Sequence, residues 1–292
     1  MLRAPHKRQA PRFRSERGNA SINAGRRTIP KAASATSGLL IRIAVAISIA
    51  FFLLPLVGLL LRTPWTELGI ELASPPVRSA LWLSLVCSLA ATAISLLFGV
   101  PLAWALSRWT FPGKALVRAL TTLPMILPPV VGGVALLLAF GRRGFAGRLL
   151  EQAFGITLPF TTAGAILAET FVAMPFLVIT VEAGLRSMDR RFEDAASTLG
   201  ANRWLTFRRV TLPLIGPSLW AGGALCWARA IGEFGATITF AGNLQGRTQT
   251  IPLAVYLALE TRLESAITLS VVLLAISLTI LIVLRDRFLP NL

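Results

Sequence analysis

Long apolar stretches alternate with short polar segments along most of this chain. An α-helix needs about 20 apolar residues to cross a bilayer, and six stretches reach that length. They lie near residues 39–61, 80–106, 120–140, 162–185, 217–242 and 265–284. The pattern predicts an all-α membrane protein with six transmembrane helices, formed by residues 39–292 and preceded by a polar tail at residues 1–38.

The distribution of Lys and Arg predicts how these helices are oriented. If the N-terminus is cytoplasmic, 21 Lys and Arg residues fall on the cytoplasmic side and 7 on the opposite side. Cytoplasmic loops of membrane proteins are enriched in these residues, so we expect both termini in the cytoplasm. The pair Arg142-Arg143, which falls on the opposite side, is an exception to the bias.

Composition agrees with a membrane protein. Only 14% of the 292 residues are charged and 54% are hydrophobic, whereas soluble domains contain about 25% charged residues. Lys and Arg number 29 against 13 Asp and Glu, and nine of these basic residues precede the first apolar stretch. Nucleic-acid binding is one interpretation of the basic tail. A disordered segment beside anionic membrane lipid is the interpretation that we favour, so no nucleic-acid partner is expected.

Residues that ligate metals or act as nucleophiles are scarce. Cys87 and Cys226 lie inside apolar stretches, where a thiol packs as a small hydrophobe. His6, the single histidine of the sequence, lies in the tail. We therefore expect no catalytic residue, no metal site and no cofactor.

Prolines and glycines interrupt several apolar stretches. In the third stretch they include Pro128, Pro129 and Gly132. Irregular backbone at membrane depth is tolerated where it lines a wet cavity or is buried in protein, and small residues also let helices pack closely. These three residues are therefore candidates for lining a translocation pathway, with packing as an equal alternative.

The polar segment at residues 190–213, within a longer loop at 186–216, has the pattern of two short helices. The apolar residues of the first helix recur at the spacing of one helix face: Phe192, Ala195, Ala196 and Leu199. Gly200 suits a left-handed C-cap, and Asn202 suits the N-cap of a second helix that ends near Leu212-Pro213. Because such short helices are marginally stable alone, the segment needs a partner surface.

The spacing in this segment resembles the loop of the inner-membrane subunits of ABC importers. An acid, two alanines, a glycine, an aliphatic residue and Leu-Pro fall at the family's positions: Asp194, Ala195, Ala196, Gly200, Val210, Leu212 and Pro213. Glu193 precedes Asp194, so either carboxylate is a candidate for the family's acidic contact. The resemblance implies that the loop docks into a cleft of a separate ATP-binding cassette ATPase. A generic amphipathic helix on the lipid surface is the alternative.

This chain is not expected to hydrolyse ATP itself. The sequence contains no G-x-x-x-x-G-K-[ST] phosphate-binding loop. ATP hydrolysis is therefore assigned to the partner subunit.

A charged pair is expected near the middle of the fifth stretch. An isolated charge there costs about 2.5–3.5 kcal/mol on insertion scales, and Glu233 follows Arg229 by one helical turn, which allows them to pair. The pair has three candidate roles: fixing helix packing, attracting an anion in transit, or relaying protons in an ion-coupled secondary transporter. Glu169 is a second candidate partner for Arg229, and Glu182, nearer the cytoplasm, is expected to be solvated.

The sequence around this pair resembles the permeases for sulfate and molybdate. The similar segments are residues 228–243, and those closer to the molybdate branch are residues 246–256, 123–129 and 140–144. The resemblance implies a type I ABC importer permease of the plasma (inner) membrane that carries molybdate, with sulfate, thiosulfate or tungstate as alternatives. It also implies a homodimer, two ATPase subunits and an extracytoplasmic oxyanion-binding protein. Arg229, Glu233 and Thr237 join the candidates for the pathway.

Overall fold

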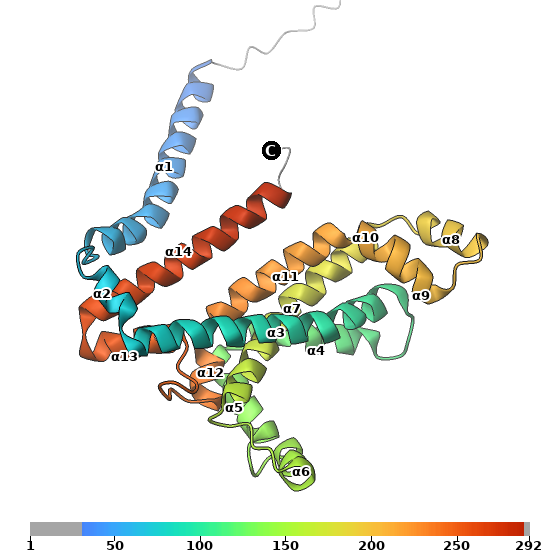
Figure 1. The fold of residues 1–292 in the computed structure, drawn as a ribbon. Coiled ribbons are helices and arrows are strands. Elements are labelled where there is room, and N and C mark those ends of the chain that lie inside the picture. The colour runs from blue at the N-terminus through green and yellow to red at the C-terminus, as the bar shows by residue number, and fades with distance from the viewer. Residues whose placement is uncertain (1–30, 289–292) are drawn as a thin grey trace, which may run out of the picture. The chain divides into compact units, whose positions relative to one another are not determined.

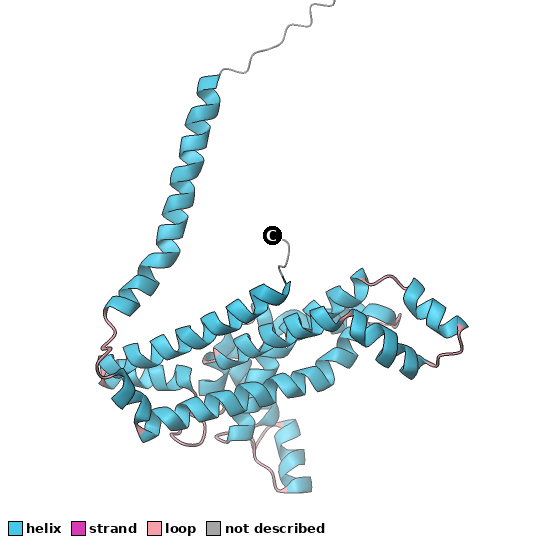
Figure 2. Ribbon diagram, turned by 45° about the horizontal axis from the view of Figure 1, so that its top comes forward, coloured by secondary structure: helices cyan, strands magenta, loops and turns pink. Residues whose placement is uncertain are grey.

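The computed structural model describes residues 31–288 of the chain, and this part is helical without strands (Figures 1 and 2). Residues 1–30 of the predicted basic tail lie outside the described part. Helix α1 begins at Lys31, within the range predicted as tail. The elements are α1 Lys31–Leu61, α2 Leu68–Ala73, α3 Pro75–Arg108, α4 Lys114–Ile126, α5 Pro129–Phe140, α6 Phe145–Phe154, α7 Thr162–Ser187, α8 Arg191–Thr198, α9 Arg203–Thr206, the π-helical turn η1 Phe207–Thr211, α10 Leu212–Leu214, α11 Gly216–Ile231, α12 Gly235–Phe240, α13 Ile251–Thr261 and α14 Leu263–Phe288.

The chain divides into two compact units, with the boundary inside α1. The first extends to Pro55 and the second from Leu56 to Leu292. The apolar part of α1, Gly38–Leu61, is long enough to span a membrane. The second unit contains every residue singled out above as a candidate site.

Four helices can each span a membrane, and two bent helix pairs raise the number of spans to as many as six in the described residues. The single spans correspond to the first, second, fourth and sixth predicted stretches. One bent pair joins α5 to α6 at 47°, and the other joins the segment Arg203–Leu214 to α11 at 71°. These bent pairs, residues 129–154 and 203–231, overlap the third and fifth predicted stretches but do not share their bounds, which were predicted as 120–140 and 217–242.

The third predicted stretch, residues 120–140, is not one continuous helix. It is divided between α4 and α5, because Leu127 and Pro128 adopt extended backbone with ψ of 131° and 130°. A proline lacks the amide hydrogen that a helix needs and restricts the residue before it to extended conformations. The prolines therefore end one helix and start the next.

The fifth predicted stretch, residues 217–242, is also interrupted. Helix α11 ends at Ile231 and α12 begins at Gly235, with Gly232, Glu233 and Phe234 between them. The helical backbone is therefore broken beside the charged pair.

The core of the second unit lies where α3, α7 and α11 pack side by side (Figure 1). Small side chains let these helices approach closely. Apart from Ile215, which precedes α11, the buried members of this cluster come from α3, α7 and α11 and include Ala91, Ala103, Ala173, Leu177, Cys226 and Ala230. At the other end of α3, Val77 packs with residues of α13 and α14. A third cluster joins α5, α7 and α12 through Leu136, Ala168 and Phe240.

Candidate functional site

The polar loop begins with α8, which ends as the sequence predicts. Gly200 has a φ of +85°, the left-handed conformation that glycine adopts without strain. The amide of Gly200 donates to the carbonyl of Ser197 at 3.0 Å, and the amide of Ala201 donates to the carbonyl of Ala196 at 3.0 Å. These bonds satisfy carbonyl groups at the end of α8.

The second part of the loop is less regular than predicted. Asn202 caps it as expected, because its Oδ1 accepts from the amide of Leu205 at 2.8 Å. The helix then changes from α9 to the π-helical η1 and back to α10, and it continues past Pro213 to Leu214. A proline at 213 cannot donate a backbone hydrogen bond to the preceding turn. The chain bends by 71° before α11.

The two acidic residues of α8 have different environments. Glu193 Oε2 lies 3.2 Å from Nη2 of Arg108, the last residue of α3. Its Oε1 accepts a hydrogen bond of 2.7 Å from Thr211 Oγ1 in η1. The neighbouring Asp194 is exposed, and its carboxylate has no hydrogen bond or ion pair within the described part of the chain. Glu193 is thus held inside the subunit, while Asp194 faces outward.

The predicted apolar face of α8 is also turned outward. Phe192 is 55% exposed and Leu199 is 89% exposed, and Trp204 of α9 is 67% exposed. The loop contacts the rest of the subunit through η1, where Phe207 stacks on Trp104 of α3 with ring centroids 4.3 Å apart. Exposed apolar residues gathered on one short segment are typical of a surface that another protein covers.

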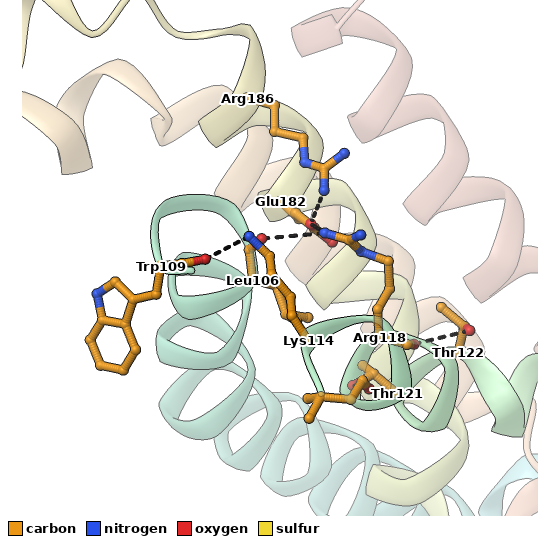
Figure 3. Close-up of polar contacts among 9 residues, drawn as sticks. Leu106, Trp109, Lys114, Arg118, Thr121, Thr122, Glu182 and Arg186 are labelled. Carbon is orange, nitrogen blue, oxygen red and sulfur yellow. Dashed lines mark hydrogen bonds and ion pairs between the residues drawn. The ribbon is translucent and has the colours of Figure 1, made fainter. Parts of the chain in front are cut away.

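Next to the loop, a buried carboxylate joins three helices (Figure 3). Oε1 of Glu182 in α7 accepts from Nη2 of Arg118 and from Nη2 of Arg186, each at 2.6 Å. Arg118, in α4, also donates to the carbonyl of Leu106 near the end of α3 at 3.3 Å. Our expectation that Glu182 is solvated was wrong, because it is 7% exposed. The partner Arg118 is 64 residues away in sequence, so no local pattern indicates it.

The structure pairs Arg229 with Glu233. Arg229 Nη2 lies 2.5 Å from Glu233 Oε2. Glu233 Oε1 accepts from the amide of Ala236 at 2.8 Å, which caps the first turn of α12. The pair therefore bridges the break between α11 and α12 instead of lying within one helix. Glu169, the other candidate partner, is buried in α7 and its Oε2 has no hydrogen-bond partner in the described residues.

The remaining pathway candidates divide between surface and interior. Pro128 and Pro129 are exposed, whereas Gly132 and Thr237 are buried. A Cβ on Gly132 would lie 3.2 Å from the ring of Phe171 in α7. Gly132 therefore permits close packing of α5, and its packing role is the one that the geometry supports.

No metal site is evident in the described residues. Cys87 and Cys226 are buried and free. Residues 31–288 contain no group of three or more His, Cys, Asp or Glu side chains placed to hold a metal ion.

Comparison with known proteins places the chain in a family. The family described as "Binding-protein-dependent transport system inner membrane component" matches residues 95–292. The molybdenum transport system permease protein ModB of Mycobacterium tuberculosis is 44% identical over 229 residues, which are 78% of this chain and 86% of the relative. The sulfate transport system permease protein CysT of Salmonella typhimurium is 37% identical over 243 residues, 81% of this chain and 87% of the relative.

A solved structure shares the fold. A bacterial alginate ABC transporter, crystallised with an alginate pentasaccharide-bound periplasmic protein, contains a chain that superposes with a TM-score of 0.67 at 20% identity. The superposition covers 87% of this chain and 95% of the other. With the family match and the multiple apolar helices, this chain belongs to the binding-protein-dependent transport family as a multi-pass inner-membrane permease subunit of an ABC importer.

Proposed function

We propose that this subunit translocates molybdate across the plasma membrane and that ATP hydrolysis by a separate ATP-binding cassette subunit drives the transport. The observation that supports coupling most directly is the arrangement of α8. Its apolar face and Asp194 point outward, while Glu193 pairs with Arg108 and holds the helix against the end of α3. A preformed helix that exposes apolar residues and one free carboxylate suits a cleft on another protein, because little ordering remains to be done on binding.

The coupling loop then comprises Glu193, Asp194, Ala195, Ala196, Gly200, Leu212 and Pro213, of which Glu193 faces the rest of the subunit. The excess of Lys and Arg on the side of this loop supports its cytoplasmic location, where ATP is available. When the ATPase subunits close, they push on α8, and the connected spans tilt and open the pathway to alternate sides of the membrane.

Similarity to the relatives supports molybdate as the substrate. The molybdenum permease is 44% identical to this chain, and the sulfate permease 37%. Both anions are tetrahedral dianions that differ mainly in size, so sulfate, thiosulfate and tungstate are the alternatives. We assign the choice among them to an extracytoplasmic binding protein that delivers the anion to a homodimer of this subunit.

The pair of Arg229 and Glu233 is better suited to attracting an anion weakly than to relaying protons. Both oxygens of Glu233 are engaged, one by Arg229 and one by the amide of Ala236. The Arg229 side chain keeps 27% of its surface exposed, which leaves part of the guanidinium accessible. A compensated charge attracts an anion without trapping it. The exposed Pro128 and Pro129 remain pathway candidates, whereas the buried Gly132 and Thr237 fit packing better.

The test is reconstitution of the full chain with its candidate ATPase and binding protein in proteoliposomes. We expect molybdate uptake that requires ATP on the side of the membrane that carries the ATPase. We also expect molybdate to stimulate ATP hydrolysis. Gly200→Pro should abolish both, because it removes an amide donor and imposes a negative φ where the chain has +85°. Gly155→Pro is the matched control, since Gly155 ends α6 with a φ of +66°.

Two results would contradict the proposal. One is ATPase association and oxyanion-stimulated hydrolysis that survive Gly200→Pro. The other is uptake that follows a proton gradient and needs no ATPase, which is the behaviour of a secondary transporter.

A further inference from the structure

The loop contacts α3 at two points one helical turn apart. Phe207 of η1 stacks on Trp104, and Glu193 of α8 faces Arg108. Trp104 and Arg108 are four residues apart in α3, so they lie on the same side of that helix. The loop is therefore attached to α3, which precedes it by more than 80 residues, as well as to its own neighbours α7 and α11.

Glu193 is the polar link between α8 and the rest of the subunit. Ser197 and Thr198 donate to carbonyl groups within α8, and Arg191 pairs with Asp189 just before it. Among the described residues, the side-chain hydrogen bonds and ion pairs that leave this neighbourhood are those of Glu193, to Arg108 and Thr211. Removing the Glu193 carboxylate therefore removes the ion pair that joins α8 to α3.

Arg108 depends on Glu193 in turn. Its side chain is 10% exposed, and its Nη2 is within ion-pair distance of Glu193 Oε2 without forming an aligned hydrogen bond. Its Nε has no hydrogen-bond partner in the described part of the chain. Glu193 supplies the carboxylate that faces this guanidinium. A largely buried charge with one compensating partner holds that partner firmly, because separation leaves the charge unpaired.

From this geometry we propose that Glu193 is a positioning residue that fixes α8 to the C-terminal end of α3, while Asp194 supplies the carboxylate that contacts the ATPase. A displacement of α8 is then passed to α3 as well as along the chain to α11. Helix α3 reaches α11 in the core, where Trp227 Nε1 donates to Ser88 Oγ at 2.9 Å. This inference rests on the proposed function, because it assigns roles within the coupling loop.

The division of roles predicts different defects for two adjacent carboxylates. Glu193→Gln keeps an acceptor for Thr211 but loses the charge that faces Arg108. We expect the variant to retain its ATPase while the molybdate transported per ATP hydrolysed falls by about tenfold. Asp194→Asn, one residue further along, should instead reduce the amount of ATPase that co-purifies with the subunit.

Charge reversal supplies the rescue. Arg108→Glu alone should be uncoupled, and adding Glu193→Arg should restore transport per ATP, because the ion pair is rebuilt with its ends exchanged and the Thr211 hydroxyl can accept as well as donate. If Glu193 had a purely structural role, its substitution would lower only the yield of assembled complex. The ratio of transport to hydrolysis, measured per assembled complex, would then stay unchanged.

A cross-linking measurement covers the case in which Glu193→Gln fails to assemble. In a chain with Cys87→Ala and Cys226→Ala, the variant Arg108→Cys with Glu193→Cys is treated with a short bifunctional thiol reagent that joins the two introduced thiols. If α8 and α3 move together, the cross-linked complex transports better than the same complex before cross-linking. A cross-link that leaves transport unchanged or lowers it overturns the inference.

The other outcomes are equally distinct. Wild-type coupling in Glu193→Gln, or a double reversal no better than Arg108→Glu, overturns the inference and leaves the proposed function intact. A wild-type chain that neither binds an ATPase nor transports molybdate contradicts the proposed function and this inference together.

Discussion

Trp227 in α11 and Ser88 in α3 are joined by a hydrogen bond of 2.9 Å between the indole Nε1 and the serine Oγ, although they are 139 residues apart in sequence. Ser88 is fully buried. The bond satisfies a polar group that would otherwise be stranded at membrane depth, and it fixes the register of the two helices.

Ser88→Ala should destabilise the subunit by about 1–2 kcal/mol, because it leaves the indole N–H without an acceptor. The expected result is a lower midpoint of thermal denaturation in detergent. Ser48→Ala is the control, since Ser48 is exposed and bonds only to the carbonyl of Ala44 in its own helix. Equal midpoints for the two variants would show that the bond does not contribute.

The network of Glu182 should be sensitive to removal of the central carboxylate. Glu182→Ala removes the acceptor that Arg118 and Arg186 share. Because these side chains are 37% and 54% exposed and water can solvate them, we expect a cost of about 1–3 kcal/mol. Arg118→Ala should cost less, and Arg186→Ala least, because the Arg186 side chain is 54% exposed. Thermal denaturation of the three variants gives the order directly, and an equal or reversed order would refute the assignment of Glu182 as the centre.

Close approach of α7 and α11 depends on Gly184. A Cβ at this position would collide with the side chain of Ser218. Gly184→Ala should therefore destabilise the protein by about 1–3 kcal/mol through overpacking, and adding Ser218→Gly should recover most of the loss. Gly223→Ala is the control, because nothing lies within 4 Å of a Cβ there. Failure of Ser218→Gly to rescue would mean that the collision is not the cause.

Single and double substitutions of Arg229 and Glu233 distinguish a role in helix packing from a role in anion guidance. Arg229→Met should be strongly destabilising, by about 3–5 kcal/mol, because it strands the buried Glu233 carboxylate. Arg229→Met combined with Glu233→Gln should be more stable than either single variant, since no unpaired charge remains. If this folded double variant still transports molybdate at the wild-type rate, the pair serves packing alone; a loss of uptake supports anion guidance.

Features set by local chemistry were predictable from the sequence. The left-handed Gly200 and the Asn202 cap were both confirmed, because each follows from the preferences of one residue and its nearest neighbours. The pairing of Arg229 with Glu233 was also visible, since residues four apart face each other on a helix. The helix break between them was not, because it depends on the packing of α12 against α5 and α7.

Features that depend on distant residues could not be predicted. Nothing near Glu182 or Glu193 in sequence indicates Arg118 or Arg108, and each partner is brought in by the packing of separate helices. The third stretch, residues 120–140, shows the same limit. Its prolines indicated irregular backbone, but only the structure shows that α4 and α5 are separate helices.

The outward-facing side chains of Phe192, Leu199 and Trp204 have a consequence for the cell that makes this protein. On the proposed function, a copy that enters the membrane without an ATPase partner displays these residues to chaperones and proteases, which recognise exposed apolar segments of incomplete assemblies. Its lifetime should then be set by how quickly a partner covers α8. The abundance of the permease would follow the supply of ATPase, and surplus copies would be removed before an unregulated pathway accumulated in the membrane.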